Sequence, residues 1–241
     1  MRRLISIFSL LFISLLAGIT YIFFAFNRPP DKSLFIDPLD RIETDKRVVA
    51  LTFDDGPSSA RTPRLLEVLT AHNTNATFFM LGKNIEKYPQ IAASVVDNGH
   101  LVGNHSYSHV RMIFKTPWFI KRDIERVDSL IRGLGQQEVG YYRPPYGDKM
   151  IVLPLLLKAM DKKMVTFDIQ TMAEYREGGL KSLAEDIVAK VRPGSIIVLH
   201  DGKDGDAEEY ADQVKKIITD LRAQNYEFVT IEELESYGAM Q

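Results

Sequence analysis

Two adjacent aspartates, Asp54 and Asp55, lie between an apolar run and a Gly-Pro turn. The run, residues 47–53, is rich in β-branched and apolar side chains and predicts a buried strand. Desolvated carboxylates in contact repel one another, so such a pair is costly unless it meets a cation or a substrate. Side chains of neighbouring residues diverge along extended backbone, so one could hold a metal while the other takes a proton.

Two histidines, His105 and His109, stand four residues apart in Asn-His-Ser-Tyr-Ser-His. In a helical turn both imidazoles would point the same way. With a carboxylate such as Asp55 they make a set of two nitrogens and one oxygen, which leaves positions open for water and substrate on Zn²⁺ or a similar ion. Alone, this spacing more often marks two exposed or hydrogen-bonded histidines. The polar residues at other predicted strand ends reverse that preference.

Further polar side chains follow other apolar runs: Arg143 before Pro-Pro-Tyr-Gly, Asp168, and His200. If a metal binds water, a general base must take its proton during attack on a carbonyl, and Asp54 is placed for that role. Arg143 could orient Asp54 and keep it ionised. His200 is the remaining candidate acid for a leaving amine, and Asp168 could raise its pKa. The plainer interpretations are a sheet-end arginine and a core histidine.

The elements that must position these residues alternate between strand and helix. Strands are predicted at 47–53, 76–81, 101–104, 141–143, 164–168, 195–200 and 227–230, and helices at 63–72, 88–98, 117–132, 150–161, 180–190, 208–223 and 231–237. This alternation implies an α/β fold with a parallel sheet and outer helices, open or closed into a barrel. Ligands bind at the carboxyl ends of the strands in such folds, so we expect the polar residues to gather at one rim.

Composition narrows the function classes. The 241 residues contain 45% hydrophobic and 26% charged residues, which are ordinary values for a globular protein. A net charge of -2 gives no basic field, so nucleic acid is not expected as a partner. The absence of cysteine excludes disulfides, thiolate metal sites, a cysteine nucleophile and a lipid-modified cysteine.

A charge-free apolar run extends from Leu4 to Phe26. It is long enough to span a bilayer and longer than the apolar part of most cleaved signals, and no small-residue cleavage site follows it. We therefore expect a membrane anchor at 1–26, a tether at 27–46 and a catalytic domain at 47–237; a cleaved signal and a secreted protein remain the alternative. Arg2 and Arg3 favour a cytoplasmic N-terminus and an extracytoplasmic domain, although Arg28 and Lys32 weaken that argument.

In this order, the motifs Thr-Phe-Asp-Asp-Gly-Pro, His-Ser-Tyr-Ser-His, Arg-Pro-Pro-Tyr and Val-Leu-His resemble those of the polysaccharide deacetylases, the NodB homology domain of carbohydrate esterase family 4. The resemblance covers about residues 47–237. It implies a distorted, incomplete (β/α) barrel and metal-dependent removal of acetyl groups from N-acetylglucosamine-type sugars. The roles it implies are a base (Asp54) with its steadying arginine (Arg143), metal ligands (Asp55, His105, His109), an acid (His200) with its tuning carboxylate (Asp168), and contacts to the oxyanion or substrate (the Tyr146 amide, Leu199).

One stretch departs from the family pattern. Thr171 and Met172 replace an aspartate and a tryptophan that typically follow the first aspartate of this segment. The substrate is therefore open among peptidoglycan, poly-N-acetylglucosamine, chitin fragments and acetylated xylan, and the metal among Zn²⁺, Co²⁺, Ni²⁺ and Mn²⁺. Hydrolysis of a non-glycan C–N bond on the same scaffold is an alternative function. A non-catalytic glycan-binding protein would be expected to lack a catalytic or metal residue, and the sequence keeps them all.

Overall fold

A curled parallel sheet forms the centre of the computed structural model, which describes residues 2–27, 29–173, 179–203 and 205–238. Seven strands of the described chain form it: β1 (Val48–Asp54), β2 (Thr77–Met80), β3 (Leu101–Asn104), β4 (Tyr141–Tyr142), β5 (Lys163–Met164), β6 (Ile196–His200) and β7 (Glu227–Val229). Their order is β5-β4-β3-β2-β1-β6, and β7 pairs with the beginning of β1. The strands pair in parallel, which confirms the predicted incomplete barrel.

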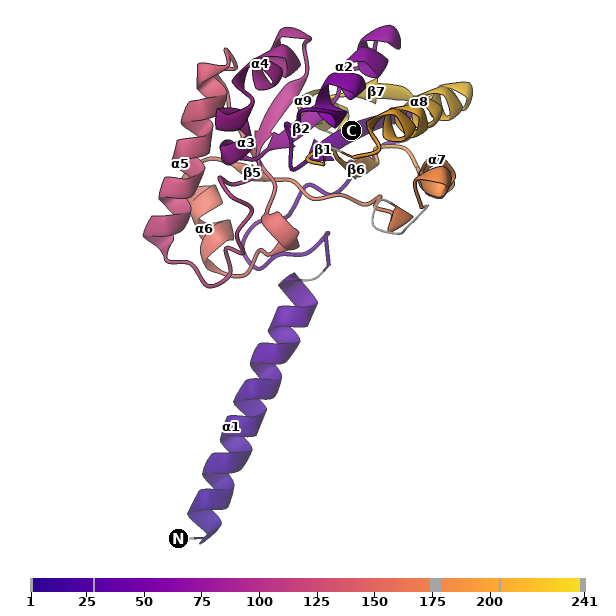
Figure 1. The fold of residues 1–241 in the computed structure, drawn as a ribbon. Coiled ribbons are helices and arrows are strands. Elements are labelled where there is room, and N and C mark those ends of the chain that lie inside the picture. Colours follow the sequence, from indigo (N-terminus) through magenta and orange to yellow (C-terminus); the bar gives the residue numbers. More distant parts are fainter. Residues whose placement is uncertain (1, 28, 174–178, 204, 239–241) are drawn as a thin grey trace.

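Helices cover the outer face of the sheet (Figure 1). They are α2 (Arg61–Ala71), α3 (Gly82–Lys87), α4 (Pro89–Asp97), α5 (Pro117–Gly133), α6 (Val152–Ala159), α7 (Leu183–Val188) and α8 (Ala207–Ala223). The last helix, α9 (Ile231–Gly238), packs on the other face of β1, against Val48 and Ala50. Two 3₁₀ turns are η2 (Pro145–Gly147) and η4 (Gly179–Ser182). All seven residues of β1 are buried, and the main core lies between this strand and α2 and α8. The short helix α3 has too few residues to show a periodic pattern, and the sequence analysis did not predict it.

Part of the predicted tether, 27–46, is built into the sheet. Leu39 bridges Val165 in parallel; its N–H donates to Met164 O at 2.8 Å and its carbonyl accepts from Thr166 N at 2.8 Å. Ile42 N donates to Gly194 O at 3.0 Å, and both Leu39 and Ile42 pack on a second apolar cluster. Burying these two side chains explains why this segment joins the domain. β5 is shorter than the predicted strand 164–168: Val165 N still donates to Tyr142 O at 2.9 Å, but Thr166 N donates to Leu39.

The apolar N-terminal run forms α1 (Arg2–Ile22) and a π-helical turn η1 (Phe23–Asn27), which project away from the domain (Figure 1). An 18-residue window of the stretch Phe8–Asn27 has a mean hydropathy of 2.2 and is not buried within the structure, whereas Asn27 at the end of the stretch is buried. Twenty helical residues extend about 30 Å, the thickness of a bilayer core. This stretch is therefore a candidate membrane span or a signal sequence. Arg28, used above in the charge argument, lies outside the described residues.

Candidate active site

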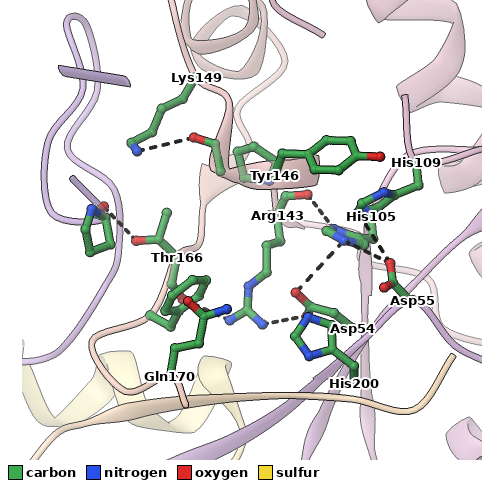
Figure 2. Close-up of a pocket in the computed structure, with 14 residues that line it drawn as sticks. Asp54, Asp55, His105, His109, Arg143, Tyr146, Lys149, Thr166, Gln170 and His200 are labelled. Atoms are coloured by element: carbon green, nitrogen blue, oxygen red, sulfur yellow. Dashed lines mark hydrogen bonds and ion pairs between the residues drawn. The ribbon is translucent and has the colours of Figure 1, made fainter. Parts of the chain in front are cut away.

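The carboxyl ends of the strands surround a cavity of about 580 Å³, a size suited to a small ligand. Fourteen residues line it: Pro30, Asp54, Asp55, His105, His109, Arg143, Pro144, Tyr146, Gly147, Lys149, Thr166, Phe167, Gln170 and His200. Figure 2 shows how the labelled side chains converge. Seven of the predicted site residues are therefore brought together, and two, Asp168 and Leu199, are not.

Asp55, His105 and His109 form the tightest group. Each offers a ligand atom, and these atoms lie within 4.8 Å of one another. Asp55 Oδ1 lies 3.5 Å from His105 Nε2 and 3.4 Å from His109 Nε2 (Figure 2). Two ligand atoms about 2.1 Å from one ion at a tetrahedral angle lie about 3.4 Å apart. The spacing therefore fits a single divalent ion with open positions.

Two further observations support a cation at this point. Asp55 Oδ1 is buried and has no hydrogen-bond partner, which is costly for a carboxylate unless a cation satisfies it. His105 Nδ1 lies 2.8 Å from the carbonyl oxygen of Arg143. Because a carbonyl only accepts, Nδ1 carries the proton and Nε2 presents its lone pair to the group. Nitrogen and carboxylate ligands suit Zn²⁺ and several neighbouring ions.

Backbone conformation, rather than helical spacing, turns the two histidines together. Residues 105–109 form a loop, in which Ser106 (φ 69°) and His109 (φ 60°) are left-handed. The Ser106 hydroxyl accepts from His109 N at 3.0 Å, and the Asn104 side chain accepts from Ser106 N at 2.9 Å. Asp55 is also left-handed, at φ 72°, so it leaves the strand direction of Asp54 and the pair does not diverge as an extended backbone would. Such residues cost of order 1–3 kcal/mol each and persist where surrounding contacts hold them.

Asp54 and Arg143 form a buried ion pair beside the three ligands. Arg143 Nη1 donates to Asp54 Oδ1 at 2.7 Å, and the two residues are 2% and 4% exposed. The guanidinium is held by Thr52 Oγ1 at 2.8 Å and the Thr166 carbonyl at 2.9 Å. Burial alone raises the pKa of Asp54, but Arg143, His105 and His200 outweigh it and lower that pKa below its usual value. Asp54 is therefore an anion in the folded protein.

His200, the last residue of β6, lies beside Asp54 (Figure 2). Its backbone N–H donates to the Tyr210 hydroxyl at 3.0 Å, and its carbonyl accepts from Arg61 Nη1 at 3.1 Å. The imidazole lines the cavity, so it can exchange a proton with a bound molecule. Tyr146, at φ 58° in η2, lies across the mouth, with its ring centroid 4.4 Å from that of His109.

The prediction that Asp168 tunes His200 is wrong. Asp168 accepts hydrogen bonds at the beginning of β6, from Ser195 Oγ at 2.9 Å and Ile196 N at 2.8 Å. Four strand residues, about 13 Å, separate Ile196 from His200. Arg192 Nε also lies 3.3 Å from this carboxylate. Asp168 therefore holds the far end of the strand.

The prediction that Leu199 contacts substrate is also wrong. Leu199 is fully buried in the main apolar cluster and lies opposite Phe53 in the strand register. Because successive side chains alternate between the faces of a strand, His200 faces the cavity and Leu199 faces the helices.

The sequence did not single out five of the cavity residues: Pro30, Lys149, Thr166, Phe167 and Gln170. Gln170 lies two residues after Asp168, next to the positions that depart from the family pattern. The neighbouring Thr171, which departs from the family pattern, is buried and donates to Asp186 at 3.1 Å, and Met172 is 62% exposed. Neither lines the cavity, whereas Gln170 does.

Asp201 is a buried acid behind the cavity. Thr62 Oγ1 donates to its Oδ2 at 2.5 Å, while Oδ1 has no partner. Burial raises its pKa to about 7, with the charges of Asp55 and Asp54 adding to this shift. A Cβ on Gly56 would lie 2.3 Å from this carboxylate, which explains the glycine after Asp55.

Comparison with known proteins agrees with the fold. The polysaccharide deacetylase family matches residues 41–165. A peptidoglycan-N-acetylglucosamine deacetylase of Bacillus cereus is 32% identical over 77% of this chain and 67% of its own length. The deacetylase PgdA of Listeria monocytogenes is 32% identical over 86% of this chain, which spans 42% of that protein. The peptidoglycan-N-acetylmuramic acid deacetylase PdaA of Bacillus subtilis is 30% identical over 86% of this chain and 81% of its own length.

Solved structures give the same result. The Bc1960 peptidoglycan N-acetylglucosamine deacetylase, in complex with 4-naphthalen-1-yl-N-oxidanyl-benzamide, superposes with a TM-score of 0.76 at 29% identity over 81% of this chain and 91% of that one. A pseudoenzyme of carbohydrate esterase family 4 from Bacillus anthracis superposes with a TM-score of 0.75 at 26% identity over 83% of this chain and 69% of that one. Since the family match covers more than half of the residues and the relatives share these identities, the chain belongs to the polysaccharide deacetylase family.

Proposed function

We propose that this protein is a metal-dependent hydrolase that removes N-acetyl groups from an N-acetylglucosamine-containing glycan of the cell envelope, with peptidoglycan as the leading substrate. One observation carries the proposal: Asp55, His105 and His109 converge on one point, while the Asp54–Arg143 pair and His200 flank it in one cavity. Relatives named for peptidoglycan deacetylation support the choice of substrate.

The residues divide the reaction between them. A divalent ion held by Asp55, His105 and His109 would polarise the acetamide carbonyl and lower the pKa of water. Asp54, kept anionic by Arg143, accepts a proton from the water whose oxygen attacks the carbonyl carbon. His200 donates a proton to the sugar nitrogen as the C–N bond breaks, so that acetate and a free amine leave. The backbone N–H of Tyr146 is proposed to stabilise the oxyanion.

The direct test is acetate release by the full-length protein from a panel of glycans. The panel holds peptidoglycan fragments, chitin oligomers, poly-N-acetylglucosamine and acetylated xylan, with a small aryl acetamide for the non-glycan alternative. We expect activity on N-acetylglucosamine glycans, its loss in chelator, and its return with Zn²⁺, Co²⁺, Ni²⁺ or Mn²⁺. Full activity after the metal has been removed would overturn the metal-dependent mechanism, and cleavage of the small amide alone would replace the glycan substrate.

Because a member of the family is described as a pseudoenzyme, the fold alone does not establish catalysis. The non-catalytic alternative predicts glycan binding without acetate release, and the same panel separates the two. The presence of every predicted metal ligand, base and acid in the cavity favours the enzyme.

We further propose that α1 anchors the protein in the cytoplasmic membrane with the catalytic domain outside, where envelope glycans lie. Its length, its apolar composition and its exposure support this placement. Intact mass measured on protein from the membrane fraction tests it. A mature chain that begins beyond residue 26 would instead establish a cleaved signal and a secreted enzyme.

A further inference from the structure

The chain that leaves the apolar helix forms part of the catalytic cavity. Pro30 lines the cavity together with Lys149 and Thr166. The Thr166 hydroxyl donates to the Pro30 carbonyl at 2.9 Å, and the Thr166 carbonyl accepts from Arg143 at 2.9 Å. Thr166 is 3% exposed, so this contact is internal. Thr166 alone therefore connects the segment after the helix to Arg143, the arginine that holds the base.

The end of the helix is itself fastened to the cavity wall. Asn27, the last residue of η1, is 2% exposed; its amide donates to Asp148 Oδ1 at 3.1 Å and accepts from Lys149 N at 2.7 Å. Lys149 Nζ returns a bond to the Asn27 carbonyl at 3.1 Å. Asp148 and Lys149 follow η2, the turn that holds Tyr146. The helix end therefore contacts the loop that carries one side of the cavity mouth.

An apolar surface continues from the helix onto the domain. A groove of about 500 Å³ is lined by Ile19, Thr20, Phe23 and Phe24 from the helix and by Ile113, Phe114, Met150, Ile151 and Val152 from the domain. Phe114 is 88% exposed and Ile151 47%. Leu155, 45% exposed, lies four residues after Ile151 and so shares its helical face. Exposed apolar groups beside a candidate span, with Arg111 and Lys115 flanking Phe114, suit the interface of a bilayer.

The chain length limits how far the cavity can lie from the bilayer. Asn27 and Pro30 are three positions apart in the sequence, so their Cα atoms are at most about 11 Å apart. The headgroup layer on each side of a bilayer is about 5–7 Å thick. If Asn27 ends the span, the wall formed by Pro30 lies in the headgroup layer or a few ångströms beyond it.

We propose that Asn27 and Pro30 are functional parts of the catalytic cavity, that they fix the cavity at the membrane surface, and that the substrate is an acetylated glycan lying at that surface. This inference rests on the proposed deacetylase activity. In it Asn27 is a positioning residue that acts through Asp148 and Lys149, and Pro30 and Thr166 shape the wall.

The first experiment tests the wall with a soluble N-acetylglucosamine oligomer and the full-length protein in vesicles. We expect Asn27→Ala and the nearly isosteric Thr166→Val each to lower kcat/KM about tenfold in protein that remains folded and has unchanged metal content. Asn98→Ala and Thr70→Val are matched controls. These two residues do not line the cavity, and they form a hydrogen bond with each other at 3.4 Å. The kcat/KM of both variants should stay within twofold of wild type. If the Asn27 variant does not fold, the Thr166 variant carries the test. Wild-type kinetics in the folded cavity variants would overturn the inference.

The second experiment tests the position at the membrane. The same oligomer is offered free and attached to a lipid in the vesicle that holds the enzyme. We expect wild type to prefer the attached form about tenfold or more. A flexible ten-residue Gly-Ser insertion between Phe26 and Asn27 keeps the wall but lets the domain move roughly 17 Å further from the membrane. The insertion should therefore remove the preference for the attached oligomer and leave the rate on the free oligomer unchanged.

The outcomes are separable. Equal rates on free and attached oligomer in wild type, or an insertion without effect on the preference, would overturn the inference alone. No acetate from either form in wild type would overturn the proposed function and the inference with it.

Discussion

Replacing Asp54 by asparagine separates the roles of the two adjacent aspartates. The change removes a carboxylate that is 4% exposed and lies 2.7 Å from Arg143. Loss of a general base lowers turnover about 10²–10⁴-fold. Breaking a buried ion pair costs about 3–5 kcal/mol, because Arg143 stays buried without its counter-ion. Thr52 and Thr166 still accept from the guanidinium, which favours the lower end of that range.

The assay therefore reports both turnover and metal binding on folded protein. We expect Asp54→Asn to lose at least 100-fold in the kcat for acetate release while its Kd for Zn²⁺, from competition with a chromophoric chelator, stays within about tenfold of wild type. Asp55→Asn should show the reverse order of effects: weaker metal binding first, and lost turnover as its consequence. Asp97→Asn, at an exposed position at the end of α4, controls for the loss of a carboxylate.

Two results would refute this reasoning. A kcat for Asp54→Asn within threefold of wild type would exclude Asp54 as the base. Equal loss of metal affinity in the two variants would show that both carboxylates hold the ion, and the division of labour would fail.

Three further predictions concern Asp168, Gln170 and the buried His100. Asp168→Asn should lower the free energy of unfolding, measured in urea, by about 1–3 kcal/mol, because this side chain accepts hydrogen bonds at the far end of β6. The pH–rate profile of the folded enzyme should stay unchanged. A shift of its alkaline limb would instead show that Asp168 tunes the pKa of His200. Gln170→Ala should raise KM for the glycan severalfold with little change in melting temperature, because the residue is exposed and lines the cavity; an unchanged KM would remove it from substrate contact. Burial lowers the pKa of His100 from 6.5 to about 4. Between pH 6.5 and 4 the unfolded chain therefore binds a proton at this residue that the folded chain does not. The free energy of unfolding should fall by up to about 3 kcal/mol over this range as the pH is lowered. His100→Gln should flatten this decline in pH-dependent denaturation curves, and an equally steep decline in the variant would assign it to other groups.

The alternation of strands and helices predicted that polar residues at the strand ends gather at one rim, and seven of the nine predicted site residues line the cavity. Each of Asp54, Arg143 and His200 follows an apolar strand, and parallel strands bring their carboxyl ends to one edge. The same reasoning failed for Asp168, because a run of apolar residues does not reveal where pairing stops. β5 pairs with β4 only as far as Met164, and the chain then crosses to the other edge of the sheet, where Ile169 bridges Ile197 of β6 in parallel.

Local conformation was harder to predict than the gathering of residues. Helical spacing was the reason given for the convergence of His105 and His109, but left-handed residues in a loop produce it. Asp and His adopt this conformation more often than most other residues but far less often than glycine, so the residue types of Asp55 and His109 do not predict it. The side chains that hold these turns, Ser106 among them, act through hydrogen bonds that only the folded loop brings into range.

The contribution of the N-terminal segment to the cavity could not have been predicted, and it changes the interpretation of that segment. Pro29 and Pro30 suggested a spacer, because proline-rich stretches without periodicity usually form one. Yet the bond from Thr166 to Pro30 spans 136 positions, and the bonds from Asn27 to Asp148 and Lys149 span 121 and 122. Contacts of this range fix the helix end and the base-holding arginine within one hydrogen-bonded unit. A soluble fragment that begins after residue 30 would therefore lack a wall of its own cavity, and its substrate preference would not be that of the whole protein.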